Sequence, residues 1–383
     1  MILAWLTLTA HAQDLVCPEG STLSGVRPPD GNELWCTRMV DGVPAKDGPA
    51  VRFHPGGEVA ARGAYAKGER SGPWELWYAS GQEERKGSYL NGELHGHWVH
   101  WFENGQKWFE GEYSVGRAAK DWTYWYENGQ LESQGRFING AKYGDWTQWH
   151  DNGAKKSAGR YVTGAEDGLW QYWREDGSLE SEGRFRGGRK VDVWVWTFPD
   201  GRVERRATFQ DGKLQGLDAV FHPDGSRKSE VSWAQGAKDG AETTWTPEGV
   251  VQGEGQWKLG KREGLHRFFY IDGTPSRVES WRNGVKDGLW QAWFRDGSPS
   301  YQGELLDGKE VGLWKHYHDT GHPKAEGSFT DGEPTGLWKT WWPDGTPKSE
   351  GSYVDGKKDG PWTWYAESGA VERKETWVAG VQK

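Results

Sequence analysis

A glycine recurs every 24 residues through most of this 383-residue chain, without an insertion or a deletion. In several units it follows an Asp or Asn, and it occupies positions Gly68, Gly92, Gly116, Gly140, Gly164, Gly188, Gly212, Gly236, Gly260, Gly284, Gly308, Gly332, Gly356 and Gly380. One further unit, from about Gly42 to Tyr65, has a turn two residues longer. A fixed period of this length is the signature of a repeat architecture. The sequence therefore predicts an array of about 14 units over residues 41–383.

The composition limits what each unit can form. The chain has 57 Gly, 28 Trp, 14 Tyr and 12 Phe, and hydrophobic residues make up only 34 % of it, with 14 % aromatic. Aliphatic residues are too few for the long buried strands and Leu-rich helices of a doubly wound α/β enzyme. Intrinsically disordered chains are poor in aromatic residues, so disorder is also excluded. Many short strands joined by tight turns fit this composition.

One unit, from Asp331 to Tyr353, shows the expected hairpin. Its first strand contains Trp338, and its second strand ends in Glu-Gly-Ser-Tyr. Between them, Asp344-Gly345 predicts a two-residue type I′ turn, and Asp355-Gly356 is expected to open a longer turn into the next unit. The predicted fold class is therefore all-β: an elongated, single-layer antiparallel β-meander of 24-residue hairpin repeats.

The rings and glycines are expected to pack together. A glycine in the second strand leaves bare backbone on which a Trp from an adjoining strand can lie. We expect the first-strand rings to form a structural ladder that is the core, comprising Trp98, Trp122, Trp146, Trp170, Trp290, Trp314, Trp338 and Trp362. A second aromatic residue follows three positions later in most units. Either both faces of the sheet carry rings, or a bulge brings the two rings together.

The N-terminal segment differs from the array. Residues 1–12 are apolar up to an Ala-His-Ala sequence and are expected to be a signal peptide. They depart from the usual signal in that no Lys or Arg stands before the apolar stretch. The alternative is a frayed apolar N-terminus. Residues 13–40 are expected to form a small cap closed by a Cys17–Cys36 disulfide, as exported proteins permit. The predicted location is therefore periplasmic, cell-surface or extracellular, and no apolar run is long enough for a membrane helix.

The charge balance argues against nucleic acid as a partner. Acidic residues number 56 and basic residues 47, which gives a net charge of −9 with the basic residues spread evenly. Such a chain has no general attraction for nucleic acid or anionic lipid.

Three polar residues replace the first-strand Trp in successive units: Asp218, Glu242 and His266. An acid, an acid and a histidine in register suggest a catalytic or metal site. Equivalent positions lie about 10 Å apart, however, whereas zinc ligands lie about 2 Å from one shared ion. A polar interaction face, or simple drift of the repeat, is therefore preferred.

Two groups of histidines are candidate metal ligands. They are His95, His97 and His100 around one first strand, and His316, His318 and His322 around another. No acid or cysteine completes either set, so exposed histidines beside tryptophan are the simpler interpretation. No nucleophile elbow or P-loop is present, and we expect no catalytic residue, metal or cofactor.

The pattern G-x-W-x-x-W-x-x-[DN]-G, followed by E-G-x-[YF]-x-[DN]-G, resembles the MORN-repeat family. It is most similar to the bacterial MORN variant of YwqK-type antitoxin proteins, over nearly the whole chain past residue 41. The resemblance implies a β-hairpin array used as a scaffold or binding surface. A repeat is an architecture and not a site, so the partner does not follow from it.

The resulting functional hypothesis is a non-enzymatic scaffold for protein–protein interaction at the bacterial cell envelope. One alternative is an antitoxin or immunity protein that occludes a partner toxin. Another is a cell-wall glycan binder that uses exposed tryptophans. End-to-end self-association through open sheet edges is also expected.

Overall fold

The computed structural model describes residues 15–383, so the expected signal peptide lies outside the described residues. Within that range the chain forms strands and turns, and it contains no helix long and apolar enough to cross a membrane. The described strands fall into two compact units, which are divided between Arg189 and Lys190.

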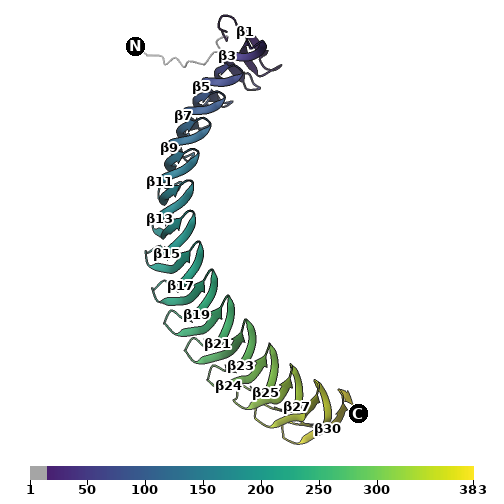
Figure 1. The fold of residues 1–383 in the computed structure, drawn as a ribbon. Helices are drawn as coiled ribbons and strands as arrows, with labels where there is room; N and C mark the ends of the chain where they lie inside the picture. The colour runs from purple at the N-terminus through teal and green to yellow at the C-terminus, as the bar shows by residue number, and fades with distance from the viewer. Residues whose placement is uncertain (1–14) are drawn as a thin grey trace, which may run out of the picture. The chain divides into compact units, whose positions relative to one another are not determined.

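The first unit contains β1 to β14, shown in purple to teal in Figure 1. The strands are β1 Thr22–Val26, β2 Glu33–Val40, β3 Val43–Phe53, β4 Val59–Ala66, β5 Glu69–Trp77, β6 Glu83–Leu90, β7 Glu93–Trp101, β8 Lys107–Ser114, β9 Arg117–Trp125, β10 Leu131–Ile138, β11 Ala141–Trp149, β12 Lys155–Val162, β13 Ala165–Trp173 and β14 Leu179–Arg186.

The second unit contains β15 to β31. The strands are β15 Arg189–Thr197, β16 Val203–Gln210, β17 Lys213–Phe221, β18 Arg227–Ala234, β19 Ala237–Trp245, β20 Val251–Lys258, β21 Lys261–Phe269, β22 Pro275–Arg282, β23 Val285–Trp293, β24 Pro299–Leu306, β25 Lys309–Tyr317, β26 Pro323–Thr330, β27 Glu333–Trp341, β28 Pro347–Val354, β29 Lys357–Tyr365, β30 Val371–Val378 and β31 Val381–Gln382.

Within each unit, every strand pairs antiparallel with the next strand along the chain. This confirms the predicted all-β antiparallel meander. At its N-terminal end, β1 pairs with β2, and the predicted Cys17–Cys36 disulfide is present.

The two turns of each repeat are the reverse of the sequence prediction. Asp355-Gly356 is the two-residue turn, because Val354 pairs directly with Lys357 and both turn residues have positive φ (46° and 75°). This is the backbone that a type I′ turn requires.

Asp344-Gly345 instead lies in the longer connection, residues 342–346, and only Gly345 of the pair has a positive φ. The N–H of Gly345 donates to the Trp342 carbonyl (2.9 Å), and the Asp344 carboxylate accepts from the Thr346 N–H (2.9 Å). Asp is therefore favoured here because its side chain bonds the backbone two residues on.

Each first strand also contains a bulge, which places the ladder ring. Between β6 and β7, Lys86 pairs with Val99 and Ser88 pairs with His95, so three residues oppose Gly87 alone. The ring of Trp98 lies directly on Gly87, where a Cβ atom would be only 2.1 Å from indole Cδ2. The indole N–H donates to the Ser88 carbonyl (3.0 Å). The predicted contact between a ladder ring and a bare glycine is thus confirmed.

Both faces of the sheet carry rings, which resolves the alternative left open by the sequence. In β5, Trp74 and Glu75 are neighbours and point to opposite faces. Arg62 pairs with Glu75 and its guanidinium lies 5.9 Å from the ring centroid of Trp77. Trp77 therefore lies on the face opposite to the Trp74 ring.

The core is the ladder face. Among the predicted ladder rings Trp98, Trp122, Trp146, Trp170, Trp314 and Trp362 are at most 4 % exposed, while Trp290 and Trp338 are partly buried. Tyr or Phe side chains of the second strands alternate with these rings edge to face, as in Tyr89–Trp98 at 5.2 Å and Phe329–Trp338 at 5.1 Å. Such perpendicular ring pairs are favoured by the aromatic quadrupole.

Gly327→Ala is expected to lower the free energy of unfolding by about 1–3 kcal/mol, because the new Cβ would overlap the Trp338 ring. The overlap is severe, since that Cβ would lie 2.1 Å from indole Cδ2. The matched control is Gly253→Ala, whose Cβ would meet its nearest atom at 3.4 Å. The control should change stability by less than about 1 kcal/mol and in the stabilising direction. Thermal denaturation of both variants measures this, and equal effects would contradict the packing argument.

Leu259→Asn is expected to stabilise the protein by about 1 kcal/mol. Leu259 is the first residue of a two-residue turn and has a positive φ of 49°, which is unfavourable for leucine. Its side chain is 74 % exposed, so buried contacts do not offset this cost. Asn adopts this conformation more easily, as Asn283 does at the same position. Urea denaturation tests this, with Asn283→Leu as the reverse change. A loss of stability in Leu259→Asn would show that Leu259 makes contacts that outweigh the strain.

Candidate functional site

The candidate site is the part of the second unit where the tryptophan ladder is interrupted. Here the glycine opposite the ladder position changes together with the ladder residue. Asp218 pairs with Ala207 and Glu242 pairs with Val231, so both glycines have gained a side chain. His266 again places a ring at the ladder position, and the residue opposite it is again a glycine, Gly255. The glycine is thus present where a ring must lie on it.

A second substitution restores the lost volume. Between successive ladder residues, most other second strands contribute Tyr or Phe, as at Tyr89 and Phe137. In the interrupted part this position holds Trp233, Trp257 and Trp281. Large rings therefore occupy the second strand where the first strand has lost them, which keeps the core filled.

Asp218 is buried, with 8 % of its surface exposed, and its carboxylate is held by Arg205. The guanidinium makes two parallel bonds to the carboxylate, at 2.8 and 2.9 Å. It also lies 4.9 Å from the ring centroid of Trp196. A bidentate Arg–carboxylate pair of this kind satisfies both charges without a partner molecule.

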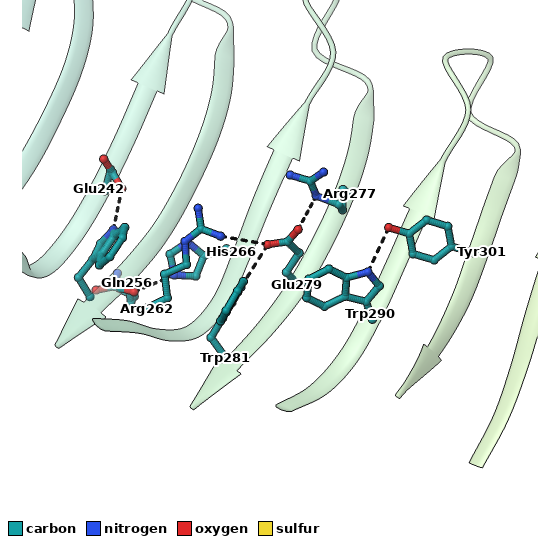
Figure 2. Close-up of polar contacts among 10 residues, drawn as sticks. Glu242, Gln256, Arg262, His266, Arg277, Glu279, Trp281, Trp290 and Tyr301 are labelled. Atoms are coloured by element: carbon teal, nitrogen blue, oxygen red, sulfur yellow. Dashed lines mark hydrogen bonds and ion pairs between the residues drawn. The ribbon is translucent and has the colours of Figure 1, made fainter. Parts of the chain in front are cut away.

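Glu242 is bound from two sides. Lys238 lies 2.6 Å from one carboxylate oxygen. The indole N–H of Trp257 donates to the other oxygen at 2.6 Å, the bond that reaches Glu242 in Figure 2. The Lys238 ammonium also lies 4.6 Å from the Trp257 ring centroid. The carboxylate, the ammonium and the ring therefore form one closed network.

His266 takes over the role of a ladder tryptophan. It is 3 % exposed, lies on Gly255 and contacts the Gln256 carbonyl through Nε2 at 2.8 Å (Figure 2). Trp98 makes the equivalent bond to the carbonyl of Ser88. Nε2 is the donor, since a carbonyl oxygen only accepts. Burial lowers the pKa of His266 below its ordinary value.

Glu279 is the residue that the sequence analysis missed. It stands 24 residues after Gly255, at the position of the ladder glycine, and aligning the second-strand glycine column would have found it. It is only 4 % exposed, and its carboxylate contacts Arg277 (2.6 Å), Arg262 (3.3 Å) and the indole N–H of Trp281 (3.2 Å). Figure 2 shows these groups converging on Glu279.

The side chain of Glu279 changes the ladder ring opposite it. Trp290 pairs with Glu279 in register, and its indole N–H donates to the Tyr301 hydroxyl at 3.1 Å instead of to a backbone carbonyl (Figure 2). Trp290 is accordingly only half-buried. The interruption therefore extends over four repeats, from Asp218 to Trp290.

The structure places most of these residues, which the sequence suggests as a polar interaction face, inside the core. Asp218 and His266 are buried, and Asp218, Glu242, His266 and Glu279 are each bound by groups of the chain itself. Their polar atoms therefore have hydrogen-bond or ion-pair partners within the protein, as buried polar groups require. Whether a partner contacts this segment stays a prediction.

The histidine groups lie in structural environments as well. In residues 15–383, no group of three or more His, Cys, Asp or Glu is arranged to hold a metal ion. His100 stacks on Phe109 at 4.1 Å, and burial lowers its pKa to about 4. His318 contacts the Trp341 carbonyl at 3.0 Å through Nε2.

Four segments of the chain match the family model described as MORN repeat variant: residues 94–114, 120–139, 310–331 and 334–355. The match supports the resemblance at the level of the repeat. The resemblance to YwqK-type antitoxins stays a prediction. No curated protein matches the chain in sequence.

Two of the solved structures similar to this chain are toxin assemblies. One is TcdB2-TccC3 (11 % identity, 92 % of this chain and 20 % of that chain, TM-score 0.16). Another is the Photorhabdus luminescens Tc holotoxin pore (12 % identity, 91 % of this chain and 23 % of that chain, TM-score 0.14). The chain thus spans about a fifth of those chains, and at these scores the likeness carries no argument about function.

His266→Phe is expected to reduce the pH dependence of stability. Because the pKa of His266 is lower in the folded state than its ordinary value of 6.5, folding favours the neutral ring. The stabilisation contributed by the neutral His266 ring is fully present above the pKa of the unfolded state. It is lost as the pH falls from that value towards the lower pKa of the folded state. Phenylalanine keeps a ring but cannot titrate, and it loses the bond to Gln256 at a cost of about 1 kcal/mol.

Thermal denaturation at neutral and mildly acidic pH tests this expectation. The wild type should be more stable than His266→Phe at neutral pH, and the difference should shrink on acidification. A difference that stays constant with pH would contradict the burial of a neutral His266. The other histidines are present in both proteins, so their contribution to the pH dependence cancels in this difference.

Proposed function

We propose that the protein is a non-enzymatic β-repeat scaffold that mediates protein–protein interaction at the bacterial cell envelope. The MORN-variant segments and the hairpin array support the scaffold class. A repeat array offers an extended surface built from equivalent positions. The polar residues that could have served chemistry are bound within the core, which favours a binding role over a catalytic one.

The observation that carries this proposal is a row of exposed aliphatic side chains in the second unit. Each stands one residue before a ladder position, so it points to the face opposite the ladder. All are between 41 % and 55 % exposed. This leucine row consists of Val193, Leu217, Leu265, Leu289, Leu313 and Leu337.

The leucine row is not required by the repeat fold. In the first unit the same position holds His97, Asp121 and Asp145, in repeats with the same strands and the same ladder contacts, and only the last of its ladder repeats has a leucine there, Leu169. The side chains of the leucine row recur two strand spacings, about 10 Å, apart, with Ala241 at the position between Leu217 and Leu265. Polar side chains of the intervening strands lie between them on the same face, such as Ser328 beside Leu313. A regular row of exposed apolar side chains is a candidate interaction surface.

Export is the second part of the proposal. The Cys17–Cys36 disulfide is compatible with an oxidising compartment such as the periplasm or the cell surface. The envelope location rests on this bond together with the apolar N-terminal segment seen in the sequence.

The alternatives are outcomes of one test. A glycan binder would need exposed ladder rings, and most of those rings are buried, so this alternative has less support. An immunity protein would bind a single toxin in fixed stoichiometry.

The test compares the protein with Leu289→Ser/Leu313→Ser/Leu337→Ser in an affinity capture from envelope extract, followed by mass spectrometry. The three side chains are about half exposed, so the variant should fold normally. We expect the wild type to retain envelope proteins, or further copies of itself, and the triple variant to lose them by about tenfold or more. Ile271→Ser, which is 62 % exposed but lies outside the row, is the matched control.

Three results would redirect the proposal. Capture of one dominant, stoichiometric toxin would favour the immunity protein. Recovery of polysaccharide alone would favour glycan binding. Retention of the same proteins by the triple variant would remove the leucine row as the interaction surface.

A further inference from the structure

A cation covers many of the ladder rings. It comes from the residue four positions before the ladder tryptophan, which lies over the indole at 4.0–4.7 Å from the ring centroid. These pairs are Arg70–Trp74, Lys142–Trp146, Lys190–Trp194, Lys286–Trp290 and Lys358–Trp362. Each is a cation–π contact on the ladder face.

At Trp314 the sign of this position is reversed. The residue four positions earlier is Glu310, and no Lys or Arg of residues 15–383 lies over the Trp314 ring. Glu310 is half-buried and makes no ion pair in that range. Burial raises the pKa of Glu310, with no neighbouring charge to oppose it. The carboxylate is therefore partly desolvated without a counter-charge.

The same repeat also lacks a ring. Between Trp290 and Trp314 the second strand contributes Leu305, where the other repeats have Tyr, Phe or Trp. The shorter side chain leaves a pocket of about 510 Å³. Its aromatic lining is Trp290, Tyr301, Trp314 and His316, with Glu310 at its wall. Trp314 itself is nearly buried, so the half-buried Tyr301, His316 and Trp290 supply most of the open aromatic surface.

We propose that this pocket binds an organic ammonium group, with the rings around its alkyl substituents and Glu310 as its counter-ion. Aromatic rings with a nearby carboxylate are the chemistry that recognises alkylated ammonium groups. The two lysines that line the pocket do not fill this role. Lys286 lies over Trp290 at 4.1 Å, and Lys309 is paired with Asp331 at 2.8 Å.

The ammonium group has two sources, a lysine side chain of a protein or a free quaternary ammonium compound. This site goes beyond the proposed scaffold function and lies on the ladder face, away from the leucine row. Its test uses small molecules and no protein partner, so its failure is distinguishable from failure of the scaffold proposal.

Another repeat provides a natural comparison. Trp170 also has a glutamate four residues earlier, Glu166, but Tyr161 fills the space beside it with ring centroids 5.0 Å apart. That site has the acid without the pocket. Glu166→Lys is therefore the control for Glu310→Lys, which reproduces the lysine of the Lys286–Trp290 pair.

The experiment is calorimetric titration of the full chain with choline, with N-acetyl-lysinamide and with 3,3-dimethylbutanol, the uncharged isostere of choline. We expect at least one of the two ammonium compounds to bind at least about tenfold tighter than the alcohol. Tighter binding of choline would identify a free quaternary ammonium as the source, and tighter binding of the lysine compound would identify a protein side chain.

Two variants test the site itself. Glu310→Lys should abolish binding by placing a built-in cation over Trp314, and Leu305→Tyr should abolish it by filling the pocket with the ring found in neighbouring repeats. Glu166→Lys should bind as the wild type does. Circular dichroism confirms that each variant is folded, and either pocket variant suffices if the other does not fold. Equal affinity for the alcohol and both ammonium compounds, or unchanged binding in the folded pocket variants, would overturn the proposal.

Discussion

The contact between an indole ring and a bare glycine determines how each repeat is built. A single-layer sheet of two short strands per repeat cannot bury its apolar face alone, so each repeat depends on its neighbours. Placing Trp98 flat on Gly87 brings the ring close enough for its N–H to reach the Ser88 carbonyl. The bulge at Gly96, with φ of 74°, turns the strand so that the ring can lie there. One contact thus joins packing, a hydrogen bond and backbone geometry.

The interrupted part of the second unit shows that this contact is specific. Where Asp218 and Glu242 replace the ring, Ala207 and Val231 replace the glycine, and Trp233 and Trp257 supply the missing volume. His266 keeps Gly255 and the bond to a backbone carbonyl. Buried charges in this segment are paired with Arg, Lys or indole N–H groups, as a low-dielectric core requires. The segment is therefore an alternative core and does not need a ligand to explain it.

The repeat period, the strands, the disulfide and the contact of rings with glycines could be predicted, because each depends on local sequence. The turn types could not, since Asp-Gly suits a type I′ turn and also a longer loop with one left-handed glycine, as Asp355-Gly356 and Asp344-Gly345 show. The role of Asp218 and His266 was hidden because burial depends on which face the strand presents. Glu279 was missed because a glycine position was not expected to hold a charge. The pocket beside Trp314 required knowing that Leu305 and Glu310 face the same ring.

A double-mutant cycle on Gly87 and Trp98 tests the central claim most directly, with the free energy of unfolding measured by denaturant titration. Gly87→Ala alone places its Cβ into the ring, and Trp98→Ala alone leaves a cavity in the core. If the glycine is there to receive the ring, Gly87→Ala should cost about 1–3 kcal/mol with Trp98 present and almost nothing once Trp98 is Ala. Additive effects of the two substitutions would mean that the glycine and the ring are independent, and would contradict the account.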